Sequence, residues 1–312
     1  MYAAESVRRG LMSSGLTPQS MFPLPGLKQT VSWHGPSRTF RMSAGFIPQG
    51  ICVAGDYLLV TAYDSNPADN RSLLLNSVIY VLEPSTGAYI TTIAAHGKSH
   101  VGGICFDNDR KFIWYSNGTA VAGFSYDTLC GIVKDCRDDK SGEAAAYRLV
   151  SAEKHFSVLK QSSFLAYFDG LLWVGTFNSK GTGEIFGYSY ELSDSEARPV
   201  FEMQAPSKAQ GMFFYRREKE VYLAVSCSYG LMTSTVRLYK ISYPASGRKA
   251  SVVKIIKHDA YEVLKFPHGL ENIAVNGNRV YIMFESAKVM TKYPLNKVDR
   301  IVKYKLRDFL HI

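Results

Sequence analysis

Residues 48–64 read "PQGICVAGDYLLVTAYD": a polar opening, an apolar run, a Gly-Asp turn, and a second apolar run that ends in an acid. This pattern is typical of two short strands joined by a tight turn. Four similar phrases follow it, namely "VGGICFDNDRKFIWYSN" (101–117), "SSFLAYFDGLLWVGTFN" (162–178), "AQGMFFYRREKEVYLAVSCS" (209–228) and "LENIAVNGNRVYIMFES" (270–286). Five copies of one hairpin indicate a repeat architecture.

The spacing of the copies predicts the kind of repeat. Aligned on Gln49, Gly102, Ser163, Gln210 and Glu271, the copies are 53, 61, 47 and 61 residues apart. Each interval has room for a third and a fourth strand, and after the first copy "NSVIYVLEP" and "AYITTIAA" supply them around a Ser-Thr-Gly turn. Units of this length suit a four-stranded propeller blade. We therefore predict an all-β fold, a five-bladed β-propeller of four-stranded antiparallel blades.

The fifth unit lacks a fourth strand, because the chain ends after "DRIVKYKLRDFLHI". Closed propellers avoid an open sheet edge, so we expect an N-terminal strand to complete this blade. Residues 28–33 and 37–45 are strand-like and belong to no other unit. We accordingly expect one propeller domain over 28–312, preceded by a partly flexible extension over 1–27. A six-bladed ring is the alternative, but it needs about 45 further residues.

Two segments are expected to be fourth strands of their units. They are "AYRLVSA" (146–152) in the second unit and "ASVVKIIK" (250–257) in the fourth. In the second unit an insertion over 128–144 precedes that strand and contains Cys130 and Cys136. These two cysteines are close enough in sequence for a local disulfide, and free thiols are the alternative.

The composition excludes several classes of protein. The 312 residues are 46% hydrophobic and 13% aromatic, enough to bury a large core. The net charge of +9 is dispersed along the chain, so we expect no nucleic-acid partner. No apolar run is long enough for a transmembrane helix. We expect a monomer.

The N-terminal segment leaves two compartments open. It contains the arginine pair "RR" at 8–9, but no continuous apolar stretch like that of a signal peptide follows. Either the protein is cytoplasmic, or a signal has been removed and the protein is extracellular or belongs to the cell envelope. We expect the second location.

Polar residues recur at both ends of the repeated hairpin. The aligned positions form an opening ring of Gln49, Gly102, Ser163, Gln210 and Glu271, and the hairpin ends form a closing ring of Asp64, Asn117, Asn178, Ser228 and Ser286, with Glu285 beside it. The first strand of each blade starts on the face where the second strand ends, so both rings meet at one mouth of the central channel. Polar groups that converge on an apolar scaffold are typical of a ligand site, although they also line water-filled channels.

The chemistry of these residues suggests several uses. We expect Gln49, Asp64, His100, Asn117, Asn178, Gln210 and Glu285 to contact a ligand. His268 and Glu271 stand three residues apart and are candidates for catalytic proton transfer. A hard cation such as calcium would instead take oxygen ligands from Asp64, Asn117, Asn178 and Glu271.

The repeated phrases, together with the closing segment "KYPLNKVDRIV", resemble a group of bacterial, often exported, β-propeller proteins. More distantly, the chain is similar to the lactonase, streptogramin-lyase and quinoprotein-like propellers. The resemblance covers about residues 40–306. Metal-dependent lactonase-like propellers hold their ion with Glu, Asn and Asp side chains, so the resemblance implies a divalent cation held by Glu271, Asn117 or Asn178, and Asp64.

Three functions follow as hypotheses. The first is binding of a small polar or carbohydrate-like ligand at the channel mouth. The second is a metal-assisted lyase or hydrolase in which a cation polarises a carbonyl group and His268 or Glu271 moves the proton. The third is a scaffold for a protein partner that contacts the loop "DSNPADNRSLLLN" (64–76) through Leu73–Leu75. These leucines can equally pack against the neighbouring blade.

Overall fold

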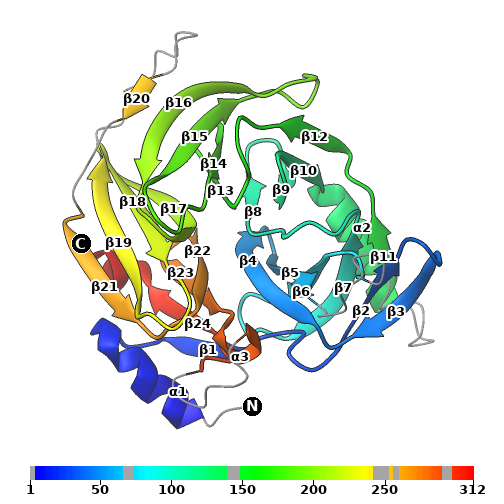
Figure 1. The fold of residues 1–312 in the computed structure, drawn as a ribbon, viewed down its shortest axis with the longest axis horizontal. Helices are drawn as coiled ribbons and strands as arrows, with labels where there is room; N and C mark the ends of the chain where they lie inside the picture. Colours follow the sequence, from blue (N-terminus) through cyan, green and yellow to red (C-terminus); the bar gives the residue numbers. More distant parts are fainter. Residues whose placement is uncertain (1–3, 66–73, 139–147, 242–252, 256–259, 290–296) are drawn as a thin grey trace.

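The protein folds as a ring of five β-sheets around a central channel (Figure 1). The structure is a computed structural model that describes residues 4–65, 74–138, 148–241, 253–255, 260–289 and 297–312. The predicted five-bladed, all-β propeller is thus confirmed.

The blades follow one another along the chain, and each runs from the channel outward. Blade I contains β4 (Phe46–Ala54), β5 (Tyr57–Asp64), β6 (Val78–Leu82) and β7 (Tyr89–Ala95). Blade II contains β8 (Ile104–Asp107), β9 (Phe112–Asn117), β10 (Ala120–Ser125) and β12 (Lys154–Ser157). Blade III contains β13 (Phe164–Phe168), β14 (Leu171–Gly175), β15 (Gly183–Ser189) and β16 (Arg198–Ala205). Blade IV contains β17 (Ala209–Arg217), β18 (Glu220–Cys227), β19 (Ser234–Ile241) and β21 (Glu262–Phe266). Blade V contains β22 (Leu270–Asn276), β23 (Arg279–Phe284), β24 (Arg300–Lys305) and β1 (Ser20–Pro23).

An N-terminal strand closes blade V, as predicted, but it is not one of the two expected segments. Strand β1 pairs antiparallel with β24, with Ser20 opposite Lys303 and Pro23 opposite Arg300. The expected segments instead form a separate hairpin of β2 (Thr30–His34) and β3 (Thr39–Ser43). Residues 20–23 therefore belong to the ring, although we placed them in the extension.

Blades I and III each carry a fifth strand that the sequence assigned elsewhere. Strand β11 (Arg148–Val150) pairs parallel with β7 of blade I, and β20 (Val253–Ile255) pairs parallel with β16 of blade III. Both segments were expected to be fourth strands of blades II and IV, and those positions are taken by β12 and β21. The chain thus adds a strand to the preceding blade before it completes its own.

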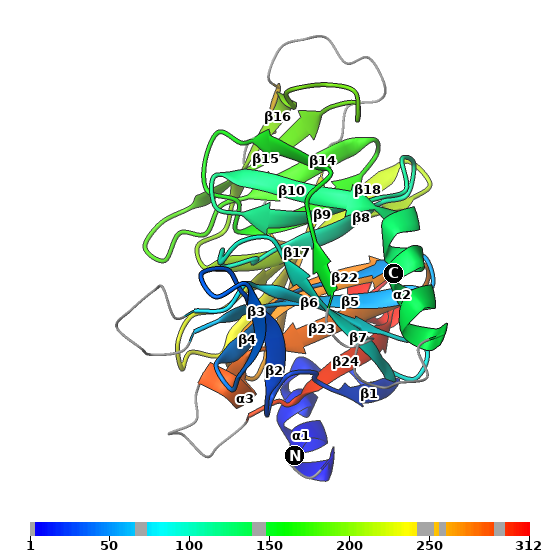
Figure 2. The same ribbon diagram turned by 90° about the vertical axis from the view of Figure 1, so that its right-hand side faces the viewer.

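Five hydrophobic clusters fill the five interfaces between neighbouring blades, because successive residues of a strand point to opposite faces of a sheet. The clusters are represented by Ile79 with Ile113 (I–II), Trp114 with Leu172 (II–III), Trp173 with Leu223 (III–IV), Ala224 with Ile282 (IV–V) and Met283 with Val60 (V–I). The helices α1 (Ala4–Leu11) and α4 (Leu306–Leu310) add side chains to the cluster between blades IV and V. Figure 2 shows α1 beside β1 and β24 of blade V, and the 3₁₀ helix η1 (Met12–Ser14) follows α1. Each blade is therefore buried on both faces.

The expected insertion of blade II contains a helix, α2 (Tyr126–Asp138). Its cysteines, Cys130 and Cys136, are free thiols, so the disulfide alternative is wrong. Six residues of α-helix turn through about 600°, which places two side chains on different faces of the helix. Cys136 lies 3.4 Å from the Thr91 hydroxyl and contacts blade I instead.

A buried polar cluster joins blades II and III. The Tyr190 hydroxyl accepts a hydrogen bond from Trp114 Nε1 at 2.9 Å and donates one to Asp107 at 2.5 Å. Arg110 lies over the Tyr190 ring and forms an ion pair with Asp107 at 3.3 Å. The fully buried carboxylate of Asp107 is thus both hydrogen-bonded and neutralised.

The loop proposed as a partner contact lies largely outside the described residues, which resume at residue 74. Leu75 is buried in the cluster between blades V and I. That leucine therefore packs against the propeller. Among the described residues, no helix is long and apolar enough to cross a membrane.

Candidate functional site

A cavity of about 460 Å³ opens at the face where the inner strands begin. All five blades contribute to its lining, which consists of Ile47, Gln49, Tyr63, His100, Gly102, Gln161, Ser162, Ser163, Phe177, Gln210, Tyr229, Gly230, Glu271 and Glu285. No lysine or arginine is among them. The cavity thus lies at the mouth where the sequence placed the two polar rings.

Irregular strand pairing occurs at three of the lining side chains. The register between the first two strands shifts at Gln49 in blade I, at Gln210 in blade IV and at Glu271 in blade V. A bulge adds a residue to one strand and redirects its side chain, and it is common next to functional sites. In blades II and III the inner strands begin after Gly102 and Ser163.

Hydroxyl groups on the second strands hold the polypeptide around these positions. Thr61 accepts a hydrogen bond from the Gly50 N–H at 2.8 Å and donates one to the Val101 carbonyl of the next blade at 2.7 Å. Ser226 of blade IV is similarly placed 3.1 Å from the Glu271 carbonyl of blade V. These contacts connect neighbouring blades at the level of the cavity.

Two carboxyl groups, Glu271 and Glu285, dominate the electrostatics of the cavity. Glu271 is only 3% exposed, and its Oε2 has no hydrogen-bond partner in the described part of the chain. Burial and the neighbouring Glu285 raise the pKa of Glu271 well above its usual range. Burial also raises the pKa of Glu285 to about 7, against the effect of a 3.3 Å hydrogen bond from Gln49 Nε2. Near neutral pH the pair therefore contains a protonated acid beside one that is partly ionised.

A glycine, Gly269, packs closely against the segment that carries Glu285. Gly269 has a φ of +74°, and a Cβ atom there would lie 2.8 Å from the Ser286 Cβ. Its carbonyl accepts a hydrogen bond from the Glu285 N–H at 2.8 Å. Since L side chains rarely adopt this φ, glycine suits the position.

Aromatic rings form much of the remaining wall. Tyr63 and His100 pack with their ring centroids 4.2 Å apart, and Phe177 and Tyr229 with theirs 6.1 Å apart. Burial and the charges of Glu285 and Glu271 raise the pKa of Tyr63 to about 12, whereas burial lowers the pKa of His100. Both side chains are therefore neutral at pH 7.

Asn272 crosses the channel beneath the cavity. This side chain is 1% exposed, and its Nδ2 donates to the Gly102 carbonyl at 3.1 Å and lies 3.4 Å from the Gln210 carbonyl. Because these carbonyls belong to blades II and IV, one amide links three blades. It lies between Glu271, which lines this cavity, and Ile273, which lines a second one.

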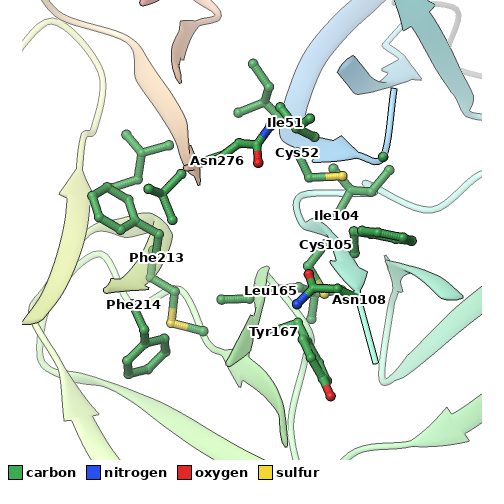
Figure 3. Close-up of a pocket in the computed structure, with 18 residues that line it drawn as sticks. Ile51, Cys52, Ile104, Cys105, Asn108, Leu165, Tyr167, Phe213, Phe214 and Asn276 are labelled. Carbon is green, nitrogen blue, oxygen red and sulfur yellow. The ribbon is translucent and has the colours of Figure 1, made fainter. Parts of the chain in front are cut away.

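The second cavity, of about 320 Å³, lies farther along the inner strands (Figure 3). Most side chains of its wall are apolar and they include Cys52 and Cys105, with the amides of Asn108 and Asn276 on opposite sides. Burial raises the pKa of both thiols. None of the unpaired buried polar atoms identified in the described residues belongs to this wall, so the first cavity is the stronger candidate for a functional site.

Five of the predicted site residues come together in the first cavity: Gln49, His100, Gln210, Glu271 and Glu285. The predicted residues Asp64, Asn117, Asn178 and His268 are not among those that line it. His268 has an unpaired, buried Nε2, and burial and Lys297 lower its pKa.

Two other oxygen ligands of the predicted metal site, Asp64 and Asn178, form local hydrogen bonds. The Asp64 carboxylate accepts hydrogen bonds from the Ser43 hydroxyl at 2.9 Å and the Leu75 N–H at 3.0 Å. Asn178 Oδ1 accepts from the N–H groups of Lys180 and Gly181. Of the four predicted ligands, the lining of this cavity contains Glu271 but not Asp64, Asn117 or Asn178, and a divalent cation held by all four stays a prediction. The described residues also contain no group of three or more His, Cys, Asp or Glu side chains suited to a metal.

Sequence reasoning missed the aromatic wall by one residue. Tyr63 and Phe177, which line the cavity, directly precede Asp64 and Asn178 of the predicted closing ring. Since side chains alternate along a strand, an error of one residue selects the opposite face. The signal was present in blade V, where Glu285 stands before Ser286.

Comparisons with known proteins add little to this description. No family model matches the chain, and no curated protein matches it. Among solved structures, the chain is similar to the glutaminyl cyclase of Myxococcus xanthus, with a TM-score of 0.46 and 10% sequence identity, over 89% of this chain and 94% of that one. The expected resemblance to lactonase-like propellers is not confirmed by these comparisons, and the chain is assigned here to a fold and not to a family.

Proposed function

We propose that the protein binds a small polar ligand in the cavity at the channel mouth. The observation that carries this proposal is the Glu271 carboxyl group, which is buried in the cavity wall with one oxygen unpaired. A buried polar atom without a partner costs about 1–3 kcal/mol, and a ligand that donates a hydrogen bond removes this cost. The volume of about 460 Å³ suits a small molecule.

The test is a ligand screen against the wild-type chain and a variant with a blocked mouth. Gln161 lines the cavity and is exposed, so we expect Gln161→Trp to fold normally and fill the opening. Sugars, polyols, amino acids and amines are screened by thermal shift and by ligand-observed NMR. We expect compounds that bind wild type to lose binding to the variant. Equal binding to both proteins, or no binding by any class, would argue against the proposal.

A second function, acid–base catalysis, is favoured by the pKa of about 7 for Glu285 beside the higher pKa of Glu271. One protonated and one ionised carboxyl group can act as general acid and general base at neutral pH. Compounds that bind are incubated with wild type, Glu271→Gln and Glu285→Gln, and products are followed by NMR. Conversion by wild type that both variants lose supports this function, and equal conversion by all three rejects it.

A further inference from the structure

The acceptors of the first cavity point to a positively charged ligand. Besides Glu271 Oε2, the buried Gln49 Oε1 has no hydrogen-bond partner among the described residues, and Glu285 adds a second carboxyl group. Carboxylate and amide oxygens accept hydrogen bonds, whereas an ammonium group has three donors and no acceptor. One ammonium group thus has a donor for each of the three side chains.

The charges of the wall support the same class of ligand. The chain has a net charge of +9, yet among the residues that the structure describes no lysine or arginine lines the cavity beside its two acids. One described lysine lies close to the lining, since Lys208 Nζ is 5.8 Å from the Tyr229 ring centroid. Burying a carboxylate without a counter-ion is unfavourable, and a cation from outside would remove this cost. A sugar hydroxyl would satisfy an acceptor but would leave the charge uncompensated.

The aromatic wall and the rim suit the rest of such a molecule. Phe177 and Tyr229 line the cavity, and beyond them Leu231 and Met232 are 53% and 57% exposed in the loop that follows β18. Aromatic faces attract cations and also pack against apolar groups. This side of the cavity can therefore hold an apolar group attached to the cation.

We propose that the ligand carries an ammonium group that binds between Glu271 and Glu285 and an apolar group that packs against Phe177 and Tyr229. The inference rests on the proposed function, since it names the class of ligand for the same cavity. It requires binding to depend on the amine charge and on both acids.

Binding of the cation is coupled to protons. The titratable groups on the wall are Tyr63, His100, Tyr229, Glu271 and Glu285, and Lys208 stands at the rim. An ammonium group favours the ionised form of both glutamates, so binding releases protons near neutral pH. Affinity should rise from about pH 6 to about pH 8, through the pKa of Glu285.

The experiment compares two probes of nearly equal shape, 2-phenylethylamine and 2-phenylethanol, by calorimetry in buffers of different ionisation heat. Hydrogen bonds to charged groups contribute about 1.5–3 kcal/mol, so the amine should bind roughly 10- to 100-fold more tightly. Because amine binding releases protons, the measured heat of amine binding should change with the ionisation heat of the buffer. Both Glu271→Gln and Glu285→Gln should remove this preference, whereas Glu184→Gln, in an ion pair with Lys160 outside the cavity, should retain it.

Two further measurements make the outcomes distinct. Tyr229→Ser should weaken the binding of 2-phenylethylamine but not the binding of methylamine, which has no apolar group to reach that wall. Carbon-13 NMR of the glutamate carboxyl groups detects weak binding through a lowered pKa of Glu285. If the alcohol or a sugar binds in the cavity as well as the amine does, the inference is wrong and the proposed function stands. If the amines neither bind nor change the carboxyl titration, the inference is wrong, and if no compound of the ligand screen binds either, the proposed function is wrong as well. Amine binding retained by Glu271→Gln overturns the inference.

Discussion

Replacing Glu285 by glutamine should stabilise the protein, and the gain should depend on pH. The pKa of this carboxyl group rises from an ordinary 4.5 to about 7 on folding. Each pKa unit corresponds to about 1.4 kcal/mol, so ionised Glu285 costs the folded state roughly 3 kcal/mol. Because the folded-state pKa is the higher one, the contribution of protonated Glu285 to stability is fully present below about pH 4.5. This contribution is lost as the pH rises through about 7. Glutamine keeps an acceptor for Gln49 Nε2 but does not ionise.

The assay is urea unfolding of wild type and Glu285→Gln, followed by circular dichroism at about pH 4 and about pH 9. We expect equal free energies of unfolding at the lower pH and a gain of roughly 3 kcal/mol for the variant at the higher one. Glu184→Gln, outside the cavity, is the matched control. The reasoning fails if Glu285→Gln has the same effect at both pH values, or if it destabilises the protein at the higher one.

Three substitutions test other parts of the structure. Asn272→Ala removes the amide that reaches the Gly102 carbonyl and should lower the free energy of unfolding by about 1–3 kcal/mol in urea denaturation; an unchanged value would show that the link across the channel is weak. Gly269→Ala places a Cβ 2.8 Å from that of Ser286 at a φ of +74° and should lower the free energy of unfolding by more than about 1 kcal/mol in the same assay. Gly277→Ala is the control for the effect of φ alone, because a Cβ there has open space at a φ of +55°. Tyr190→Phe should cost about 1–3 kcal/mol by thermal or urea unfolding, because it removes a hydroxyl that both donates and accepts in the buried cluster, and a neutral result would contradict the importance of that cluster.

The blade count could be read from the sequence because each blade begins with the same hairpin. Local pairing of neighbouring strands depends on residues that are close along the chain, and "LENIAVNGNRVYIMFES" contains both strands and their turn. The partners of later strands are not local. Residues 148–150 and 253–255 have the composition of any outer strand, yet β11 and β20 pair with preceding blades. Composition alone carries no information about which edge such a strand joins.

The site was predicted in part for a similar reason. Gln49, Gln210 and Glu271 were found because their position recurs in every copy, although the bulges that redirect them are visible only in the pairing register. Tyr63 was missed because the end of β5 offered two adjacent candidates on opposite faces, and the polar one was chosen. Asp64 was instead needed for hydrogen bonds within its own blade region.

The buried acids of this protein differ in whether the fold provides partners for their carboxyl groups. Asp107 is buried beside Arg110 and the Tyr190 hydroxyl, and Asp64 receives two hydrogen bonds. The fold thus provides partners for these carboxylates, but Glu271 retains an unpaired oxygen next to a second acid. A local cost in an otherwise consistent fold is expected where function requires it. We therefore expect Glu285→Gln, which gains stability at high pH, also to lose affinity for the amine. A variant that gained stability and kept its affinity for the amine would show that the cost of the buried acid pair is unrelated to ligand binding.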